Sequence, residues 1–376
     1  MQSLTQAPRQ NLTAAQVKSL ITGSQVQITP GLELLDGNNN FVGDISSTLV
    51  SGTVERNCLA AIHGTCNLVL EGAVGWGVDR LRPFMVLSNG KISARFNLGV
   101  FVIQTPVANL AENPITYSVT GYDLLCFLDV PVGDTYAVTS GTTYFTAIQS
   151  IISALNIGSN LYLDGTLQSS TLPNDMVWAL TPGSTTTWLD IINDLLGSIN
   201  YRNLWADENG NFRSTPAVLP STRAVEWILD TSDNTQNIVA PKRDVTSDVF
   251  DAHNWWRFVR TPMTTKPVEG AGIYTVQNTS TGRTSQTALG RTIKAPVQFL
   301  TAADQTSLTA QGNAIVAADQ RVSRTFTISL DPLPVAGHLD IVQFKDNGSS
   351  DICQVDSWVT DLMGKSSQWI LEAVNA

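Results

Sequence analysis

The sequence has few charged residues and few histidines. Only 14% of its 376 residues are Asp, Glu, Lys or Arg, against about 25% in a typical globular protein. The polar surface must therefore consist largely of Thr, Ser, Asn, Gln and Gly, a composition that favours strands and turns over exposed helices. The three histidines leave few places for a metal site or a general base.

The chain also has no basic stretch and no long apolar run. Its 22 basic and 32 acidic residues give a net charge of −10, and the basic residues are scattered, so we expect no stable nucleic-acid binding. No run approaches the roughly 18 apolar residues of a membrane span, and residues 1–9 lack the apolar centre of a signal peptide. We therefore expect no membrane span and synthesis in a cytoplasm.

The cysteines show no CxxC spacing, so we interpret Cys58, Cys66, Cys126 and Cys353 as small core residues that remain thiols. With His63, two of them form the pattern C-x4-H-x2-C. That spacing matches no zinc pattern. A strand and a turn with two buried thiols is the favoured interpretation.

Alternation of apolar and polar residues predicts short antiparallel strands in the first third of the chain. Residues 92–98 and 115–120 have period two, and residues 35–40 (Leu-Asp-Gly-Asn-Asn-Asn) provide a turn. Such a series of strands suggests a barrel or a sandwich. At 376 residues the chain is long enough for two to four domains.

The middle of the chain has helical periodicity. Apolar residues at helical spacing predict one helix over 143–155 and a second over 188–199, capped by Ser184 or Thr185. Asn209-Gly210 predicts a two-residue hairpin. These elements indicate a small α+β unit.

The last third returns to strand-like sequence, at 225–229, 255–259 and 325–330 and at several positions up to residue 371. One helix is expected from Thr301 to about Asp319. The polar stretch at about 261–291 is interpreted as an inserted loop or hairpin.

Several stretches resemble the tail hub proteins found at the tail tip of tailed bacteriophages. Residues 34–44 and 50–56 look like the opening hairpin of siphophage hub proteins. The stretch from Arg82-Pro-Phe through residues 98–103 (Leu-Gly-Val-Phe-Val-Ile) resembles the family's strand in which a Leu-Gly-Val-Phe segment leads into the following strand, and 119–125 (Val-Thr-Gly-Tyr-Asp-Leu-Leu) resembles a domain-closing segment. The order of helices, Asn-Gly hairpin and Ser214-Thr-Pro also fits the family. Nearly the whole chain is covered, although 335–342 lacks the Pro-Gly-Asp turn usual in the family.

This resemblance implies a β-rich α+β fold, in which two small antiparallel, tube-like β-barrels flank and enclose an α+β middle domain. The expected domains are residues 1–130, 131–223 and 224–376. The resemblance also implies a homotrimeric, pseudo-six-fold ring at the tail tip of a virion, with a passage for DNA and without catalysis. Its expected partners are a distal tail or tail tube protein, a tape-measure protein, and tip fibre or spike proteins.

Two groups of acidic residues are candidates for a metal or acid-base site. Asp248, Asp251 and His253 form a D-x2-D-x-H group that could serve as a metal or acid-base site. A turn bonding to its own backbone is favoured, because an apolar strand follows. Asp207 and Glu208 are expected to point into water from a hairpin tip. The sequence thus predicts no catalytic residue, no metal site and no cofactor.

Trp255 and Trp256 are the most unusual pair, because neighbouring residues on a strand face opposite sides and cannot share one core. We interpret one of them as an interface residue, since aromatic residues are enriched in interfaces. The alternative is sugar stacking in a carbohydrate-binding tip adhesin. A second alternative is a tail-associated cell-wall hydrolase, which would require an additional catalytic domain.

Overall fold

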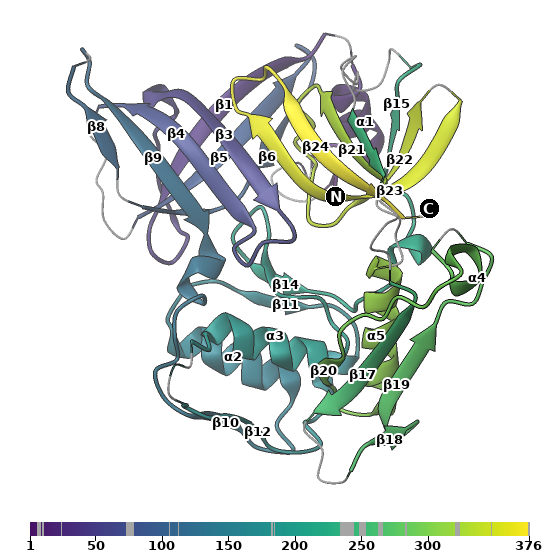
Figure 1. The fold of residues 1–376 in the computed structure, drawn as a ribbon. Coiled ribbons are helices and arrows are strands. Elements are labelled where there is room, and N and C mark those ends of the chain that lie inside the picture. The colour runs from purple at the N-terminus through teal and green to yellow at the C-terminus, as the bar shows by residue number, and fades with distance from the viewer. Residues whose placement is uncertain are drawn as a thin grey trace.

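The alternating sequences at the two ends of the chain form strands of one large, fifteen-stranded sheet (Figure 1). Its main path has the order β16-β21-β24-β23-β3-β4-β9-β7-β5-β1-β2, and β6, β8, β15 and β22 pair alongside it. The computed structural model describes residues 1–5, 9, 11–23, 25–72, 79–104, 106–111, 113–181, 183, 185–233, 244–247, 253–261, 266–282, 284–319, 324–346 and 348–374.

The strands of this sheet come from two separate stretches of sequence. The N-terminal stretch supplies β1 (Gln27–Leu35), β2 (Phe41–Asp44), β3 (Leu49–Asn57), β4 (Gly64–Glu71), β5 (Arg80–Ser88), β6 (Ser93–Asn97), β7 (Phe101–Ile103), β8 (Val107–Asn109) and β9 (Thr116–Asp123). The C-terminal stretch supplies β15 (Trp227–Asp230), β16 (Asp244–Ser247), β21 (Arg324–Leu330), β22 (Ile341–Asp346), β23 (Ser349–Asp361) and β24 (Ser367–Ala373).

The two stretches repeat one strand order. Numbered along the chain, six strands of each lie in the spatial order second, third, sixth, fifth, fourth, first. In the N-terminal region this order is β3-β4-β9-β7-β5-β1, and in the C-terminal region it is β16-β21-β24-β23-β22-β15. All these neighbours pair antiparallel except β15 and β22, which are parallel. We call these two strand sets the N-terminal and C-terminal β regions.

The β-rich α+β class is confirmed, but the described strands form no closed barrel. The reason is the length of β23, which has 13 residues. Its first part pairs with β22, and its last five residues, Ser357–Asp361, pair with β3 of the other region. The two regions consequently share one hydrophobic core, which includes Leu68 and Phe96 from one and Val355 and Trp369 from the other. The division into three domains stays a prediction.

The expected middle unit has a core of its own. Two helices lie between a three-stranded sheet and a two-stranded one (Figure 1). The elements are β10 (Tyr136–Val138), α2 (Tyr144–Ala154), β11 (Leu161–Leu163), β12 (Met176–Trp178), α3 (Trp188–Ser198), β13 (Trp205–Ala206) and β14 (Phe212–Ser214). The predicted Asn-Gly hairpin connects β13 to β14, which pair antiparallel. We call this the α+β unit.

The polar stretch at 261–291 contributes β18 and β19 to a four-stranded sheet of order β18-β19-β17-β20, which packs against α5 around a third, smaller core. The expected helix at Thr301 begins four residues later, because Thr301 is the last residue of β20 and Asp304 accepts a hydrogen bond from the Ser307 amide at 2.7 Å. The elements are β17 (Trp255–Thr261), β18 (Val268–Glu269), β19 (Gly272–Gln277), α4 (Gln286–Leu289), β20 (Gln298–Thr301) and α5 (Gln305–Asp319).

The remaining helices are short. The helix α1 (Ala14–Ile21) starts with a Thr13–Gln16 capping box, and its Val17, Leu20 and Ile21 enter the shared core. Among the described residues no helix has the length and apolar character needed to cross a bilayer. The 3-10 turns are η1 (Ser46–Thr48), η2 (Leu124–Phe127), η3 (Leu167–Ser169) and η4 (Pro220–Thr222).

The apolar stripe of α3 was predicted correctly, but its cap was not. Ile191, Ile192, Leu195 and Leu196 are all buried. The cap is Thr187, whose hydroxyl accepts from the Asp190 amide at 3.1 Å while the Asp190 carboxylate accepts from the Thr187 amide at 2.8 Å. Of the two expected caps, Thr185 is exposed and lies two residues before the cap, and Ser184 lies outside the described residues.

We predict that Thr187→Ala lowers the free energy of unfolding by about 1 kcal/mol, because the Asp190 amide loses its acceptor and the capping box its hydroxyl. Thr185→Ala is the matched control, and it should leave stability nearly unchanged. Urea denaturation of both variants beside the parent measures the difference. An equal loss in the two variants would contradict the position of the cap.

Candidate functional site

The N-terminal β region, the C-terminal β region and the α+β unit meet at one place, beside the pairing of β23 with β3. Trp358 of β23 lies opposite Arg56 of β3 in this pairing. The Trp358 indole donates a hydrogen bond to the Gly337 carbonyl at 2.9 Å. This bond attaches the loop before β22 to the strand that connects the two β regions.

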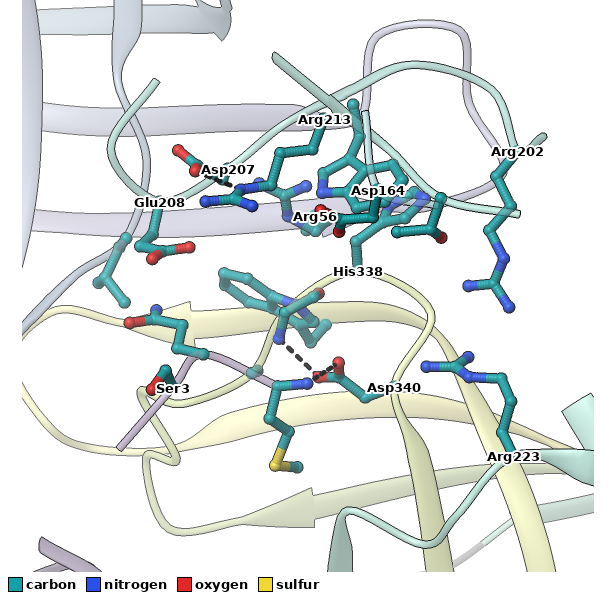
Figure 2. A pocket seen from close by; sticks show the side chains of 18 residues that line it. Ser3, Arg56, Asp164, Arg202, Asp207, Glu208, Arg213, Arg223, His338 and Asp340 are labelled. Atoms are coloured by element: carbon teal, nitrogen blue, oxygen red, sulfur yellow. Dashed lines mark hydrogen bonds and ion pairs between the residues drawn. The ribbon is translucent and has the colours of Figure 1, made fainter. Parts of the chain in front are cut away.

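A cavity of about 340 Å³ lies at this meeting point (Figure 2). Asp207, Glu208 and Arg213 lie on one side of it, and Arg202 and Arg223 on the other (Figure 2). The lining comes from all three parts of the molecule: Met1, Gln2, Ser3, Arg56, Leu98, Asp164, Arg202, Trp205, Asp207, Glu208, Arg213, Thr215, Arg223, Ala336, Gly337, His338, Asp340 and Trp358.

The hairpin carboxylate on this wall is buried. Asp207 is only 6% exposed and accepts hydrogen bonds from the amides of Asn209 and Asn211, each at 2.9 Å, and from Arg213 Nε at 2.7 Å. The expectation that Asp207 points into water was wrong, because the hairpin tip packs against the β regions instead of extending into solvent. Glu208 lines the cavity beside it.

Arg56 connects β3 with the α+β unit. It is 5% exposed, and its Nη2 donates to the Ala206 carbonyl at 2.8 Å. Its Nη1 is buried and has no hydrogen-bond partner among the described residues. Burying a guanidinium that is only partly paired costs free energy. Arg56 therefore holds β3 and the α+β unit together only if its hydrogen bond to Ala206 is kept.

Three aromatic rings from three parts of the chain are in contact at the same junction. His338 lies against Trp205 with ring centroids 4.7 Å apart and an interplanar angle of 14°, and against His63 at 4.8 Å. Burial, and then the charge of Arg56, lower the pKa of His63 to about 3. Burial, followed by His63 and Arg56, also lowers the pKa of His338 well below its ordinary value. Both rings are therefore neutral at neutral pH.

The loop that carries His338 is fixed by a carboxylate. Asp340 is buried and accepts from the Gly337 amide at 2.6 Å and from the Met1 amino group at 2.5 Å. Met1 also pairs with Glu226, and Glu226 with Arg223 at 2.8 Å. These contacts hold the segment 335–342, which lacks the Pro-Gly-Asp turn.

Cys58, His63 and Cys66, the residues of the C-x4-H-x2-C pattern, are all buried. Burial raises the pKa of both the Cys58 and the Cys66 thiol to about 12, so neither is a thiolate at neutral pH. The His63 ring contacts the His338 ring in a tilted arrangement. In the part of the chain that the structure describes, no three His, Cys, Asp or Glu side chains are grouped to hold a metal ion.

Of the group Asp248, Asp251 and His253, the structure describes only His253. Asp248 and Asp251 lie outside the described residues. His253 Nδ1 is 2.8 Å from Asp319 Oδ2, at the end of α5. The same oxygen accepts from the Trp256 indole at 2.5 Å.

The tryptophan pair divides between two environments. Trp256 is 1% exposed and belongs to the core beside α5. Trp255 is half-buried on the opposite face, where the Lys294 ammonium lies 4.9 Å from its ring centroid. Their expected opposite orientation agrees with these positions, and the interface role of the pair stays a prediction.

The sequence did not point to the junction. Its members Arg56, Trp205, His338 and Trp358 are far apart along the chain, and no local pattern connects them. The one available signal was the unusual segment 335–342, which contains His338. What the junction can do chemically is hold three parts of one chain in a fixed arrangement.

Comparison with known proteins identifies the fold. No protein-family model and no curated protein sequence matches this chain. Among solved structures, the tail protein from Neisseria meningitidis MC58 is similar at 13% identity and a TM-score of 0.62, over 92% of this chain and 96% of that one. The 43 kDa tail protein of prophage MuSo2 from Shewanella oneidensis is similar at 13% identity and a TM-score of 0.58, over 91% and 98% of the two chains.

A prophage tail protein from Listeria monocytogenes EGD-e is also similar, at 10% identity and a TM-score of 0.55, over 91% of this chain and 94% of that one. All three matches span nearly both chains, so they concern the whole architecture and not one shared module. The chain has the fold of phage and prophage tail proteins, and the resemblance inferred from its sequence is confirmed at that level.

The neutral histidines make the junction sensitive to acid. Below an unfolded pKa of about 6.5 the unfolded chain protonates an imidazole that the folded chain keeps neutral, so His63 costs stability as pH falls toward its folded pKa. From about pH 7 to about pH 5.5 we expect this one residue to remove about 1 kcal/mol of unfolding free energy. Replacing it by His63→Phe should remove that loss.

The test compares pH dependences, because other groups titrate in the same range. Burial raises the pKa of Asp123 to about 6, which works in the opposite direction by favouring the folded state as pH falls. Urea denaturation at the two pH values should show a smaller loss in His63→Phe than in the parent. His253→Asn, at a more exposed site, is the control. Equal losses in His63→Phe and the parent would contradict the neutral buried ring.

Proposed function

We propose that this chain is a structural tail hub protein, which assembles as a homotrimeric ring at the tail tip of a phage-like particle. The observation that carries the proposal is the strand order repeated in the two β regions. The likeness of the whole chain to tail proteins supports the same assignment. The mechanism is geometric, since the ring seats one set of proteins above and another below.

Symmetry explains why a repeat within one chain is useful. Three copies of a chain with two equivalent β regions present six such regions around one axis, which matches a six-fold tail tube ring. The α+β unit and the sheet around β17 occur once per chain, so they present three-fold sites. A closed ring of this kind needs equivalent contacts around its axis. The partners we propose are a tail tube or distal tail protein on the six-fold side, the tape-measure protein, and fibre or spike proteins on the three-fold side.

The ring also leaves a passage for DNA along its axis. A chain of net charge −10 repels the phosphates of DNA, so the polyanion can slide through without being retained. We propose no stable nucleic-acid binding and no catalytic role. The thiols of Cys58 and Cys66 and the ring of His63 are held in their neutral forms, which supports the second point.

We predict that the purified protein assembles into trimers that appear as rings. Its mass by size-exclusion chromatography with light scattering should be three times the chain mass of 40.5 kDa, and negative-stain micrographs should show a ring with a central hole. A protein that remains monomeric at high concentration, with no ring on the grids, would contradict the proposed hub.

We also predict that the protein does not hydrolyse peptidoglycan. Purified protein should fail to clear a suspension of cell walls, and Asp248→Ala and Asp251→Ala should behave like the parent. Lysozyme provides the positive control for the assay. Clearing that disappears in either variant would identify a tail-associated hydrolase and reject the non-catalytic hub.

A further inference from the structure

The contact between the two β regions within one chain joins defined strands. It pairs β3, the second strand of the N-terminal region, with the last part of β23, the fifth strand of the C-terminal region. The first part of β23 is covered by β22, the fourth strand of its own region. The other edge of β23 pairs with β24 from Cys353 to Thr360. The fifth strand of the C-terminal region, β23, thus extends beyond β22 and pairs there with β3, the second strand of the N-terminal region.

The N-terminal region has the same extension. Its fifth strand is β7, covered by β5 at Phe101 and Val102 and paired on the other side with β9. Further along β9 the next partner is β8. Thus β8 continues β7 along β9, as Ser357–Asp361 continue the first part of β23 along β24. Among the described strands, β8 pairs with β9 alone.

The side chains around β8 are those of a strand that lacks a neighbour. All three residues of β8 are exposed, and they include Val107 at 63%. Leu110, which follows directly, is 76% exposed. Unpaired apolar strand edges attract further strands, so soluble proteins usually cover or charge them. In this part of the chain no charged residue follows until Glu112.

The reciprocal strand is β16, the second strand of the C-terminal region. It pairs antiparallel with β21 and lies at the end of the strand path, with no second partner among the described strands. Figure 1 shows β8 at the outer side of the N-terminal region, away from the C-terminal strands. One chain therefore cannot join its own β8 to its own β16.

We propose that β8 of one copy pairs antiparallel with β16 of a second copy of this chain, repeating between copies the β23–β3 contact made within each. The proposal rests on the hub function, and it specifies the surface that closes the ring. The occupant is a second copy because this chain carries in its C-terminal region the equivalent of β3, the strand β16. Head-to-tail contacts of this kind form a ring when their rotation closes.

Cross-linking tests the contact directly. The variant Ala108→Cys with Thr246→Cys introduces one cysteine into each of the two strands, and a short bis-maleimide should convert it into covalent dimers and trimers on a denaturing gel. Each single variant, which retains the native cysteines, should give no such ladder. The matched control is Val42→Cys with Thr246→Cys, because β2 is the opposite end of the strand path and Val42 is 56% exposed.

A second variant removes the contact. Val107→Lys with Leu110→Lys puts charges on an exposed edge, where they block strand pairing without disturbing the core. The assembled mass should fall to one third, whereas Leu180→Lys, an equally exposed site on the α+β unit (55%), should leave it unchanged. Circular dichroism and thermal unfolding verify that each variant is folded.

The outcomes separate the contact from the function. A trimer that persists in the Val107→Lys, Leu110→Lys variant, or a ladder formed through Val42→Cys in place of Ala108→Cys, would overturn this contact while the trimeric hub stands. A parent protein that stays monomeric would overturn both. Covalent trimers through Ala108 and Thr246, lost in the lysine variant, are the supporting result.

Discussion

The pairing of β23 with β3 is the contact on which the rest of the arrangement depends. A strand of 13 residues is long enough to complete the sheet of its own region and to continue into the other. Because of it, the two ends of the chain share one hydrophobic core, and Arg56 and Trp358 lie opposite each other at the junction. The loop of His338 and the hairpin of Trp205 then have a fixed surface to pack on.

The sequence predicted the elements that depend on residues close together along the chain, and it did not predict contacts between distant residues. The α3 stripe, the Asn-Gly hairpin and most strands of the end regions depend on neighbours along the chain, and they were predicted. The β23–β3 pairing joins residues about 300 positions apart, and no local pattern encodes such a partner. The two separate barrels that the family resemblance implies leave this long-range pairing out.

The errors at the junction and at the helix cap have the same origin. Three threonines in succession, 185–187, can each cap a helix, and only the position of α3 on its sheet selects Thr187. Asp207 at a hairpin tip is exposed in an isolated hairpin, and it is buried here because the tip packs against the β regions. His338 belongs to no motif, and its ring contacts with Trp205 and His63 need three distant segments.

The low charge of the chain and its assembly are connected. A β protein with 14% charged residues has few charges with which to protect its strand edges, so the edges must be covered in another way. Within the chain, the second strand of one region covers the fifth strand of the other. If the same rule operates between copies, each β16 covers a β8, and three chains leave neither edge open. The repeat of strand order then has a physical purpose, because one type of contact, used six times, closes a ring from three molecules.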